Sequence, residues 1–308
     1  MALFCLLPTT LFTNQAPICA IDMGSNGFRR IVGLFANDRY AQTIETSTLG
    51  VGDDLAAHGR ISANKIVEIE KALSGFKASC DRAGASRVMA IGTAAFRDAP
   101  NADVVVKLAA SLGISMEVAT EQRESELAYL AGSLGRDGYA VIDNGSRSIE
   151  LVTRENGNYR YLVFNLGYRV AYEKFFAAAT DAMGAYRAFD AQLKEAASRA
   201  SFMKGKERLV GVEFGEMTDM LFPSAKLEGR VLEIGALRDK LQEITTSGTD
   251  RFKALKTKKD IDRALPRLAV AVSLMEAFGY TRLELTEREL GAGLIIEAGL
   301  EAANPRAK

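Results

Sequence analysis

The sequence is poor in the residues that most often build metal and nucleophile sites. Its 308 residues include a single histidine, His58, and three cysteines, Cys5, Cys19 and Cys80. One histidine excludes histidine-rich metal centres and leaves a Ser-His-Asp mechanism dependent on His58. That residue lies in a Gly- and Asp-rich stretch better read as a turn with a solvated side chain. The cysteines have neither metal-ligand nor redox spacing, and such a sparse, odd set fits a reducing cytoplasm.

The chain also lacks an excess of charge of either sign. Lys and Arg total 39, as do Asp and Glu, so the formal net charge is zero. Non-specific binding of nucleic acid usually needs excess basic charge, so we expect no nucleic-acid partner. A polyanionic substrate would have to be held by individually placed residues rather than by a global field.

Long hydrophobic runs are missing as well. The apolar segment at residues 1–12 is too short to span a bilayer, and it lacks the basic n-region and the small-residue cleavage site of a signal peptide. We therefore expect residues 1–15 to be an N-terminal extension of a cytoplasmic protein with no membrane partner. A content of 48% hydrophobic and 25% charged residues is typical of a soluble globular protein, and the length suits two domains.

A weak internal repeat is present. Residues 18–25 (ICAIDMGS) are echoed by residues 139–146 (YAVIDNGS), with Asp22 and Asp143 in equivalent places 121 positions apart. In each copy an apolar run ends in Asp, a Gly-Ser turn follows, and a second strand-like run begins. Each copy therefore predicts a hairpin with a polar, glycine-bearing tip, and the offset suits a domain length.

Strands and helices alternate between the two copies. Ser62 can cap a helix with apolar residues at spacings of three and four, and further helices are predicted at residues 101–112 and 121–134, with strands at 88–91 and 114–118. The second half adds a strand at residues 159–164, a short one at 283–285 and mostly helix elsewhere. The pattern predicts an α/β fold with helix-flanked sheets, divided into domains at residues 16–135 and 136–308.

The first hairpin tip carries groups that suit an anion. Small residues let backbone N–H groups approach a phosphate closely, and Ser25 and Asn26 add side-chain donors between Gly24 and Gly27. Asp22, at the end of the strand, could order a metal ion or a water molecule. The same residues also make an ordinary hairpin turn, and the motif alone does not separate the two readings.

Five ordered landmarks between residues 18 and 167 resemble the exopolyphosphatase / guanosine pentaphosphate phosphohydrolase family. Residues 22–28 (DMGSNGF) resemble the family's first phosphate loop, D-L-G-S-N-S-F, and residues 49–62 resemble its L-G-x-G-L…G-x-L-S stretch. Residues 92–99 (GTAAFRDA) are similar to T-S-A-L-R-D-A, and residues 124–132 to the helix start E-E-A-x-L-x-Y-L-G. Residues 141–152 resemble the second phosphate loop, and residues 165–167 the L-P-L-G that follows it.

The resemblance implies a duplicated actin-like (ribonuclease H-like) fold of the ATPase type, with a phosphate chain bound in an inter-domain cleft. It implies that Arg97 contacts phosphate and that Glu124 activates water as general base. Asp143 and Glu150, with Asp22, would lie near Mg²⁺ or another divalent cation. The residues expected to bind phosphate are Gly24, Ser25, Asn26, Gly27, Gly145, Ser146, Arg147 and Ser148.

The chain also departs from the family pattern. Residues 145–149 read GSRSI where the family has G-G-G-S-T, so two glycines are lost and close approach of phosphate is expected to be restricted. Arg147 either supplies a compensating charge or fills the site. Arg123 replaces the first glutamate of the E-E pair, and Phe214-Gly215-Glu216 replaces a third glycine-rich loop, where a ring and a carboxylate are expected to exclude phosphate.

The sequence therefore predicts an exopolyphosphatase-type hydrolase that releases terminal phosphate from polyphosphate or from a phosphorylated guanosine nucleotide such as guanosine pentaphosphate. A catalytically impaired member acting as a polyphosphate or nucleotide sensor, or as a partner-binding module, is the alternative. A small-molecule kinase with an actin-like fold ranks third. A homodimer is expected by analogy alone.

Overall fold

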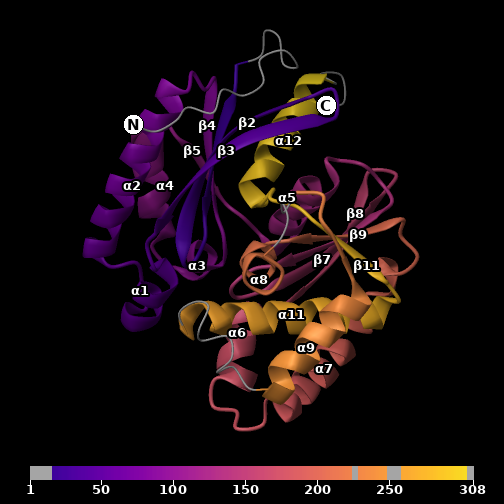
Figure 1. The fold of residues 1–308 in the computed structure, drawn as a ribbon. Helices are drawn as coiled ribbons and strands as arrows, with labels where there is room; N and C mark the ends of the chain where they lie inside the picture. The colour runs from indigo at the N-terminus through magenta and orange to yellow at the C-terminus, as the bar shows by residue number, and fades with distance from the viewer. Residues whose placement is uncertain (1–15, 224–227, 248–257, 304–308) are drawn as a thin grey trace. The chain divides into compact units, whose positions relative to one another are not determined.

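A computed structural model describes residues 16–223, 228–247 and 258–303 (Figure 1). The extension expected at residues 1–15 lies outside the described residues. The chain divides into two compact units, the first comprising residues 1–135 and 290–308 and the second residues 136–289. None of the helices in the described ranges has both the length and the apolar character needed to cross a bilayer.

The first unit is built on a five-stranded sheet in the order β3-β2-β1-β4-β5. An antiparallel meander is followed by two parallel strands, with bounds β1 (Ile18–Met23), β2 (Gly27–Ala36), β3 (Arg39–Thr48), β4 (Arg87–Gly92) and β5 (Ser115–Val118). Because β1, β4 and β5 run parallel, the segments that follow them meet at one edge of the sheet.

Helices cover both faces of this sheet. Alternate residues of β1 point to opposite sides, and because both sets are mainly apolar, each face packs against helices. Cys19, Ile21 and Met23 face a core with α2 (Ala63–Arg82) and α4 (Ala102–Ser111). Ala20 faces a second core with α5 (Glu121–Ser133) and α12 (Leu290–Ala303). Two short helices, α1 (Val51–His58) and α3 (Ala94–Asp98), follow β3 and β4. As predicted, the Ser62 hydroxyl caps α2 by accepting a hydrogen bond from Lys65 N at 3.2 Å.

The second unit repeats this plan with a six-stranded sheet in the order β10-β11-β9-β6-β7-β8. The parallel trio β11, β9 and β6 lies at its centre. The strands are β6 (Tyr139–Asn144), β7 (Ile149–Glu155), β8 (Asn158–Phe164), β9 (Arg208–Val212), β10 (Val231–Glu233) and β11 (Arg282–Leu285). The predicted hairpin around residues 145–148 joins β6 to β7.

Helices bury one face of the second sheet. Ala140, Ile142, Ile149 and Leu151 pack in a core with Ala171 of a short helix and with apolar residues of four further helices. These helices are α7 (Ala182–Ala197), α8 (Gly215–Leu221), α9 (Ile234–Ser247) and α11 (Lys258–Phe278). The mostly helical region expected after residue 164 begins with separate short elements, which are α6 (Tyr168–Ala171), a π-helical turn (Tyr172–Phe176), α7 and a 3₁₀ turn (Ser201–Met203).

The C-terminal helix α12 packs in the first unit, whereas the sequence analysis placed residues 136–308 in one domain. Its glycines allow this packing because a side chain would collide with the first unit's backbone. An added Cβ at Gly299 would lie 2.7 Å from Phe35 O, and one at Gly293 would contact the backbone of Leu127. The chain therefore leaves the first unit at residue 136 and returns to it at residue 290.

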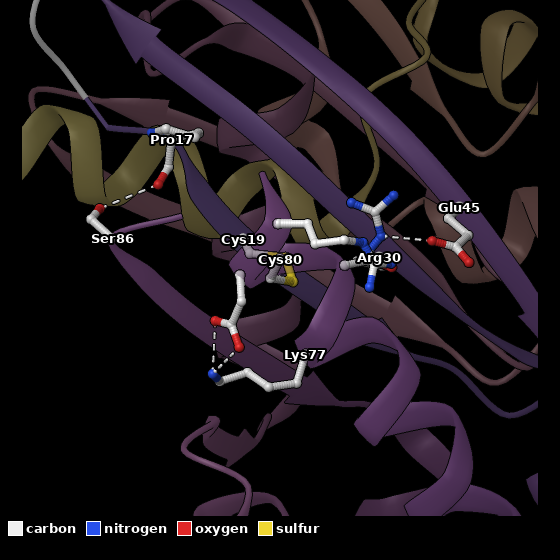
Figure 2. The surroundings of a disulfide bond; sticks show 10 residues. Pro17, Cys19, Arg30, Glu45, Lys77, Cys80 and Ser86 are labelled. Carbon is white, nitrogen blue, oxygen red and sulfur yellow. Dashed lines mark hydrogen bonds and ion pairs between the residues drawn. A yellow bond between two sulfur atoms is a disulfide. The ribbon is translucent and has the colours of Figure 1, made fainter. Parts of the chain in front are cut away.

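Cys19 and Cys80 form a disulfide bond across 61 residues of sequence (Figure 2). The bond links β1 to the last turn of α2, and both residues are fully buried. Local spacing gave no sign of this pair because the sheet and α2 bring the two residues together. The sequence analysis assigned the cysteines to a reducing compartment and predicted no pair among them, whereas Cys19 and Cys80 are bonded in the structure.

Candidate functional site

The hairpin tip of the first unit, residues 24–27 (the first tip), is held by its carbonyl groups. The backbone N–H groups of Leu49 and Gly50 donate to Asn26 O at 3.0 and 2.9 Å. Gly52 N donates to Ser25 O at 2.7 Å. These donors belong to the turn that begins α1, so this turn fixes the orientation of the tip's peptide groups.

The hairpin tip of the second unit, residues 145–148 (the second tip), is held in the same way. Gly167 N donates to Arg147 O at 2.9 Å, Tyr168 N to Gly145 O at 3.0 Å, and Arg169 N to Ser146 O at 3.0 Å. The donors again come from the start of a helix, here α6. The repeat seen in the sequence is therefore a repeat of backbone hydrogen bonding.

This arrangement leaves backbone donors available at both tips. In a trans peptide the C=O of one residue and the N–H of the next point in opposite directions. A tip carbonyl that points toward the start of α1 or α6 therefore directs the N–H of the next residue away from that helix. Within the described ranges, the N–H groups of Ser25, Asn26 and Ser146 donate to no backbone carbonyl. Successive N–H groups of this kind form the concave nests that bind phosphate.

The second tip does not need the glycines that the family pattern has. No residue between 145 and 148 has a positive φ, so Ser146, Arg147 and Ser148 adopt this backbone without the left-handed conformation that favours glycine. The glycine that the tip requires is Gly167. A Cβ there would lie 2.5 Å from Arg147 C, Gly145 O and Ser148 N. The lost glycines therefore do not strain the backbone of this tip, and the restricted approach of phosphate stays a prediction.

Two carboxylates face each other in the second unit. Asp143 and Glu150 are direct partners in the antiparallel register of β6 and β7, and they are 6% and 2% exposed. Side chains at such positions lie about 5 Å apart at their Cβ atoms, and like charges there repel. A divalent cation bound by oxygen ligands offsets that repulsion, so this pair fits a Mg²⁺-type ion.

Asp22, the equivalent of Asp143, has different surroundings. Its partner across β1 and β2 is Arg29, and it is 6% exposed. An added Cβ on Gly291 of α12 would lie 3.5 Å from Asp22 Cβ, so the helix packs closely beside the carboxylate. Asp22 thus lies opposite a basic residue, whereas Asp143 lies opposite an acidic one.

Arg97 and Glu124 are brought together at the edge of the first sheet. Arg97 is in α3 after β4, and Glu124 is in the first turn of α5 after β5. Arg97 Nη1 donates to Glu124 Oε2 and to Ala119 O, both at 2.9 Å. The side chains of Arg97 and Glu124 are 26% and 11% exposed. The first tip follows β1 at the same edge, so these elements share one end of the sheet.

Arg123, which stands where the family has a glutamate, is a structural residue in this chain. Its guanidinium donates two hydrogen bonds to Glu297 of α12, both at 2.6 Å, and one to Glu117 at 3.1 Å. The hydrogen bonds to Glu297 raise the pKa of the guanidinium above its ordinary value. The substitution therefore ties α5 to α12 within the first unit.

The segment that replaces the third glycine-rich loop places its aromatic ring in the hydrophobic core. Phe214 is fully buried in the core of the second unit, and a Cβ on Gly211 would lie 2.7 Å from its ring. Glu216 accepts a hydrogen bond from Arg267 Nη1 at 2.8 Å. Phe214 is therefore a core residue and the Glu216 carboxylate is paired with a cation, while the exclusion of phosphate by this segment stays a prediction.

Arg267 is a residue that the sequence analysis missed. It is 3% exposed, donates from Nε to Glu213 O at 2.9 Å, and stacks over the Tyr168 ring at 3.6 Å from the ring centroid. Tyr168 is the residue whose N–H holds Gly145 O of the second tip. An arginine in the otherwise apolar stretch at residues 264–272 is the signal that could have identified it.

Known proteins share sequence and fold with this chain. The family model described as the Ppx/GppA phosphatase family matches residues 41–300. Exopolyphosphatase 2 of two Mycobacterium tuberculosis strains is 30% identical over 154 residues, which are 45% of this chain and 48% of the relative. The match therefore spans about half the length of these curated relatives.

Solved structures show the same fold. The Aquifex aeolicus member of the Ppx/GppA family superposes with a TM-score of 0.79 at 22% identity, covering 93% of this chain and 98% of that one. An exopolyphosphatase from Cytophaga hutchinsonii gives 0.74 at 18% identity, covering 92% and 98%. The predicted duplicated actin-like α/β fold, with two mixed sheets and flanking helices, is confirmed.

Proposed function

The chain belongs to the Ppx/GppA phosphatase family, and on that basis we propose that it hydrolyses terminal phosphoanhydride bonds of polyphosphate or of a guanosine pentaphosphate-type nucleotide. The observation that carries the proposal is the shared construction of the two tips. In each tip, backbone N–H groups at or just before the start of a helix hold carbonyl oxygens of the tip, and N–H groups of the tip donate to no backbone carbonyl among the described residues. Such donors recognise repeated phosphate groups without excess net charge.

The first unit would supply the residues for the attack of water. Glu124 orients the water molecule and takes its proton as the water oxygen bonds to the terminal phosphorus. The bond from that phosphorus to the bridging oxygen breaks, which releases phosphate and a chain shorter by one unit. Arg97, a permanently charged donor next to Glu124, would stabilise the charge on the terminal phosphate oxygens.

The second unit would supply the cation site and further phosphate contacts. Asp143 and Glu150, with Asp22 of the first unit, are the residues proposed to hold Mg²⁺ or another divalent cation. When bound, the ion would neutralise charge on the phosphate oxygens. Gly145, Ser146, Arg147 and Ser148 would bind phosphate, with the Arg147 side chain as an additional cation.

One observation favours a second candidate function, binding without turnover. Glu124 is already engaged by Arg97 and its side chain is 11% exposed, so water must reach the carboxylate past that ion pair. If water cannot do so, the protein would act as a polyphosphate or nucleotide sensor or as a partner-binding module.

Phosphate release from polyphosphate and from guanosine pentaphosphate, with Mg²⁺ or with a chelator, tests the proposal. The Glu124→Gln variant is compared with Glu121→Gln, because Glu121 is an exposed carboxylate in the same helical turn. We expect Glu124→Gln to lower kcat about 10²- to 10⁴-fold and Glu121→Gln to leave it unchanged. Tight binding of polyphosphate with no release by the wild type would favour the sensor, and equal rates for both variants would remove Glu124 from the mechanism.

A further inference from the structure

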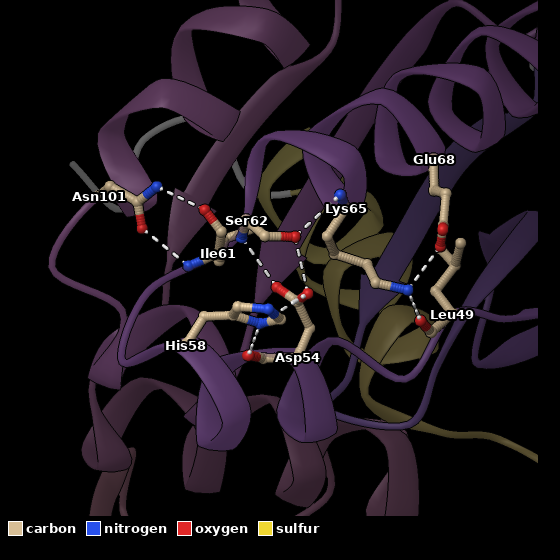
Figure 3. A network of polar contacts seen from close by, with 8 residues as sticks. All are labelled: Leu49, Asp54, His58, Ile61, Ser62, Lys65, Glu68 and Asn101. Atoms are coloured by element: carbon tan, nitrogen blue, oxygen red, sulfur yellow. Dashed lines mark hydrogen bonds and ion pairs between the residues drawn. The ribbon is translucent and has the colours of Figure 1, made fainter.

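The turn that holds the first tip is itself held from behind by α2. Lys65 extends from the first turn of α2, and its Nζ donates to Leu49 O at 2.6 Å (Figure 3). Leu49 is the residue whose N–H donates to Asn26 O. The Lys65 side chain is 15% exposed, and its Nζ also forms an ion pair with Glu68 Oε2 at 2.5 Å. The ammonium group is therefore one residue removed from the tip and largely shielded from water.

A second attachment joins α1 to the same end of α2. Asp54 of α1 accepts hydrogen bonds from Ser62 N at 2.8 Å and from the Ser62 hydroxyl at 2.7 Å (Figure 3). Its side chain is 10% exposed. The Ser62 hydroxyl in turn accepts from Lys65 N at 3.2 Å. Asp54, Ser62 and Lys65 thus form a continuous polar network between the start of α2 and the helix that follows the turn.

These hydrogen bonds connect α2 to the turn at residues 49–52, and that turn to the peptide groups of the first tip. Lys65 and Asp54 fix residues 49–54 against α2, and Leu49, Gly50 and Gly52 fix the carbonyls of Ser25 and Asn26. The packing is tight, since a Cβ on Gly52 would lie 3.0 Å from Ser25 Cβ. A shift of the turn would therefore rotate the Ser25–Asn26 peptide and redirect the Asn26 N–H.

We propose that Lys65 and Asp54 are positioning residues that set the orientation of the first tip's N–H donors and so the affinity of that tip for phosphate groups. The inference rests on the proposed function for its ligand. Among the described residues, the hydrogen bonds and ion pairs of both side chains go to residues outside the tip, and both act through the turn at residues 49–52. Lys65 serves through one directed hydrogen bond to Leu49 O rather than through its charge.

Two measurements on Lys65→Met test this proposal, because methionine keeps the apolar stem and removes the donor. The first is amide hydrogen exchange at Leu49, Gly50 and Gly52 in the full chain without ligand. The second is the affinity for tripolyphosphate, measured by titration calorimetry without added metal. Lys65→Arg retains a donor, Glu68→Gln removes only the ion-pair partner, and Lys107→Met removes an exposed lysine paired with Asp103.

We expect Lys65→Met to raise the exchange of the three amides and to weaken tripolyphosphate binding about 10-fold, the effect of one lost hydrogen bond to a charged group. Lys65→Arg should keep most of the protection from exchange and most of the affinity for tripolyphosphate. Glu68→Gln and Lys107→Met should change neither the exchange nor the affinity. Asp54→Asn should act in the same direction as Lys65→Met.

Unchanged exchange in Lys65→Met would overturn the proposal, as would faster exchange with wild-type affinity. An equal loss of affinity in Lys107→Met would show that charge, and not position, is responsible. If the wild type binds no tripolyphosphate and releases no phosphate, the proposed function fails. The proposed role of Lys65 in phosphate affinity then fails together with the proposed function. The hydrogen-exchange data still decide whether Lys65 positions the turn at residues 49–52.

Discussion

The ion pair between Arg97 and Glu124 makes the orientation of the Glu124 carboxylate depend on a single neighbouring residue. A guanidinium that donates to both Glu124 and Ala119 O holds the carboxylate in one orientation at the edge of the sheet. Fixing a carboxylate in this way reduces the freedom that a general base must lose during the reaction. Loss of Arg97 would therefore affect both the expected phosphate contact and the orientation of Glu124.

Asn144 is a buried residue whose amide has no visible role. It is fully buried, and neither of its amide atoms has a hydrogen-bond partner among the described residues. The equivalent position in the first unit is Met23, an apolar core residue. A buried amide without a partner costs about 1–3 kcal/mol. We expect Asn144→Leu to raise the thermal midpoint and Asn144→Ala to lower it, as measured by calorimetry. A lower midpoint for Asn144→Leu would show that a water molecule satisfies the amide.

The sequence predicts candidate site residues but not the interactions that they make in the structure. The tips, Arg97 and Glu124 follow from short motifs, because those motifs keep a recognisable order along the chain. The Arg97–Glu124 pair, by contrast, depends on two helices that follow adjacent parallel strands. The contact of Arg267 with Tyr168 joins residues about 100 positions apart. Such long-range contacts leave no local pattern, so sequence analysis missed them.

At the scale of elements, the disulfide between β1 and α2 is the main covalent constraint on the first unit. It closes a loop over 61 positions that contains the first tip and the turn at residues 49–52. Closing a loop of this length lowers the entropy of the unfolded chain by an amount worth about 4 kcal/mol in the chain-entropy account.

We expect a reductant to lower the urea midpoint of the wild type and to leave that of the Cys19→Ala/Cys80→Ala variant unchanged. Thiol titration of the unfolded, unreduced protein should find only Cys5. Three titratable thiols in that protein, with a midpoint that does not respond to reductant, would contradict the bond.

The contact between α1 and α2 predicts a pH dependence. Burial raises the pKa of the Asp54 carboxyl, but the hydrogen bonds from Ser62, with the charges of His58 and Lys65, outweigh it and lower the pKa below its ordinary value of 3.8. A lowered pKa means that this contact stabilises the fold above pH 3.8 and is lost as the pH falls below that value through the folded-state pKa.

Asp54→Asn should therefore lower the thermal midpoint at pH 7, and the gap to the wild type should narrow below pH 4. Asp103→Asn, in an exposed pair with Lys107, is the matched control and should leave the midpoint at pH 7 nearly unchanged. A gap that stays constant down to pH 2 would show that the Asp54 charge does not contribute.

Most elements of the first half were predicted, and fewer of the second. Helices with apolar residues at spacings of three and four, such as α2, carry a clear period. The central strand β9 has only five residues, RLVGV, and sequence analysis missed it because so short an apolar run has no period of its own. The return of α12 to the first unit was missed for a different reason. Its sequence shows a helix but not the surface that the helix covers.

At the scale of the whole molecule, the duplication is preserved in backbone geometry more than in sequence. Both tips follow a buried strand, have their carbonyls held by the start of a helix, and depend on a glycine in or beside that start, Gly52 or Gly167. The second tip keeps this geometry with Ser146 and Arg147 in place of two of the family's glycines. The changed side chains of the second tip are therefore compatible with membership of the Ppx/GppA family, because the backbone geometry of the tip is kept.

The affinity of Gly167→Ala for tripolyphosphate tests this account most directly. A Cβ at this position must displace the second tip, whereas one at Gly75, in the middle of α2, meets no atom within 4 Å. With circular dichroism confirming that both variants fold, we expect Gly167→Ala to bind at least about 10-fold more weakly than the wild type and Gly75→Ala to bind equally well. Wild-type affinity in a folded Gly167→Ala would contradict the claim that the backbone of this tip binds phosphate.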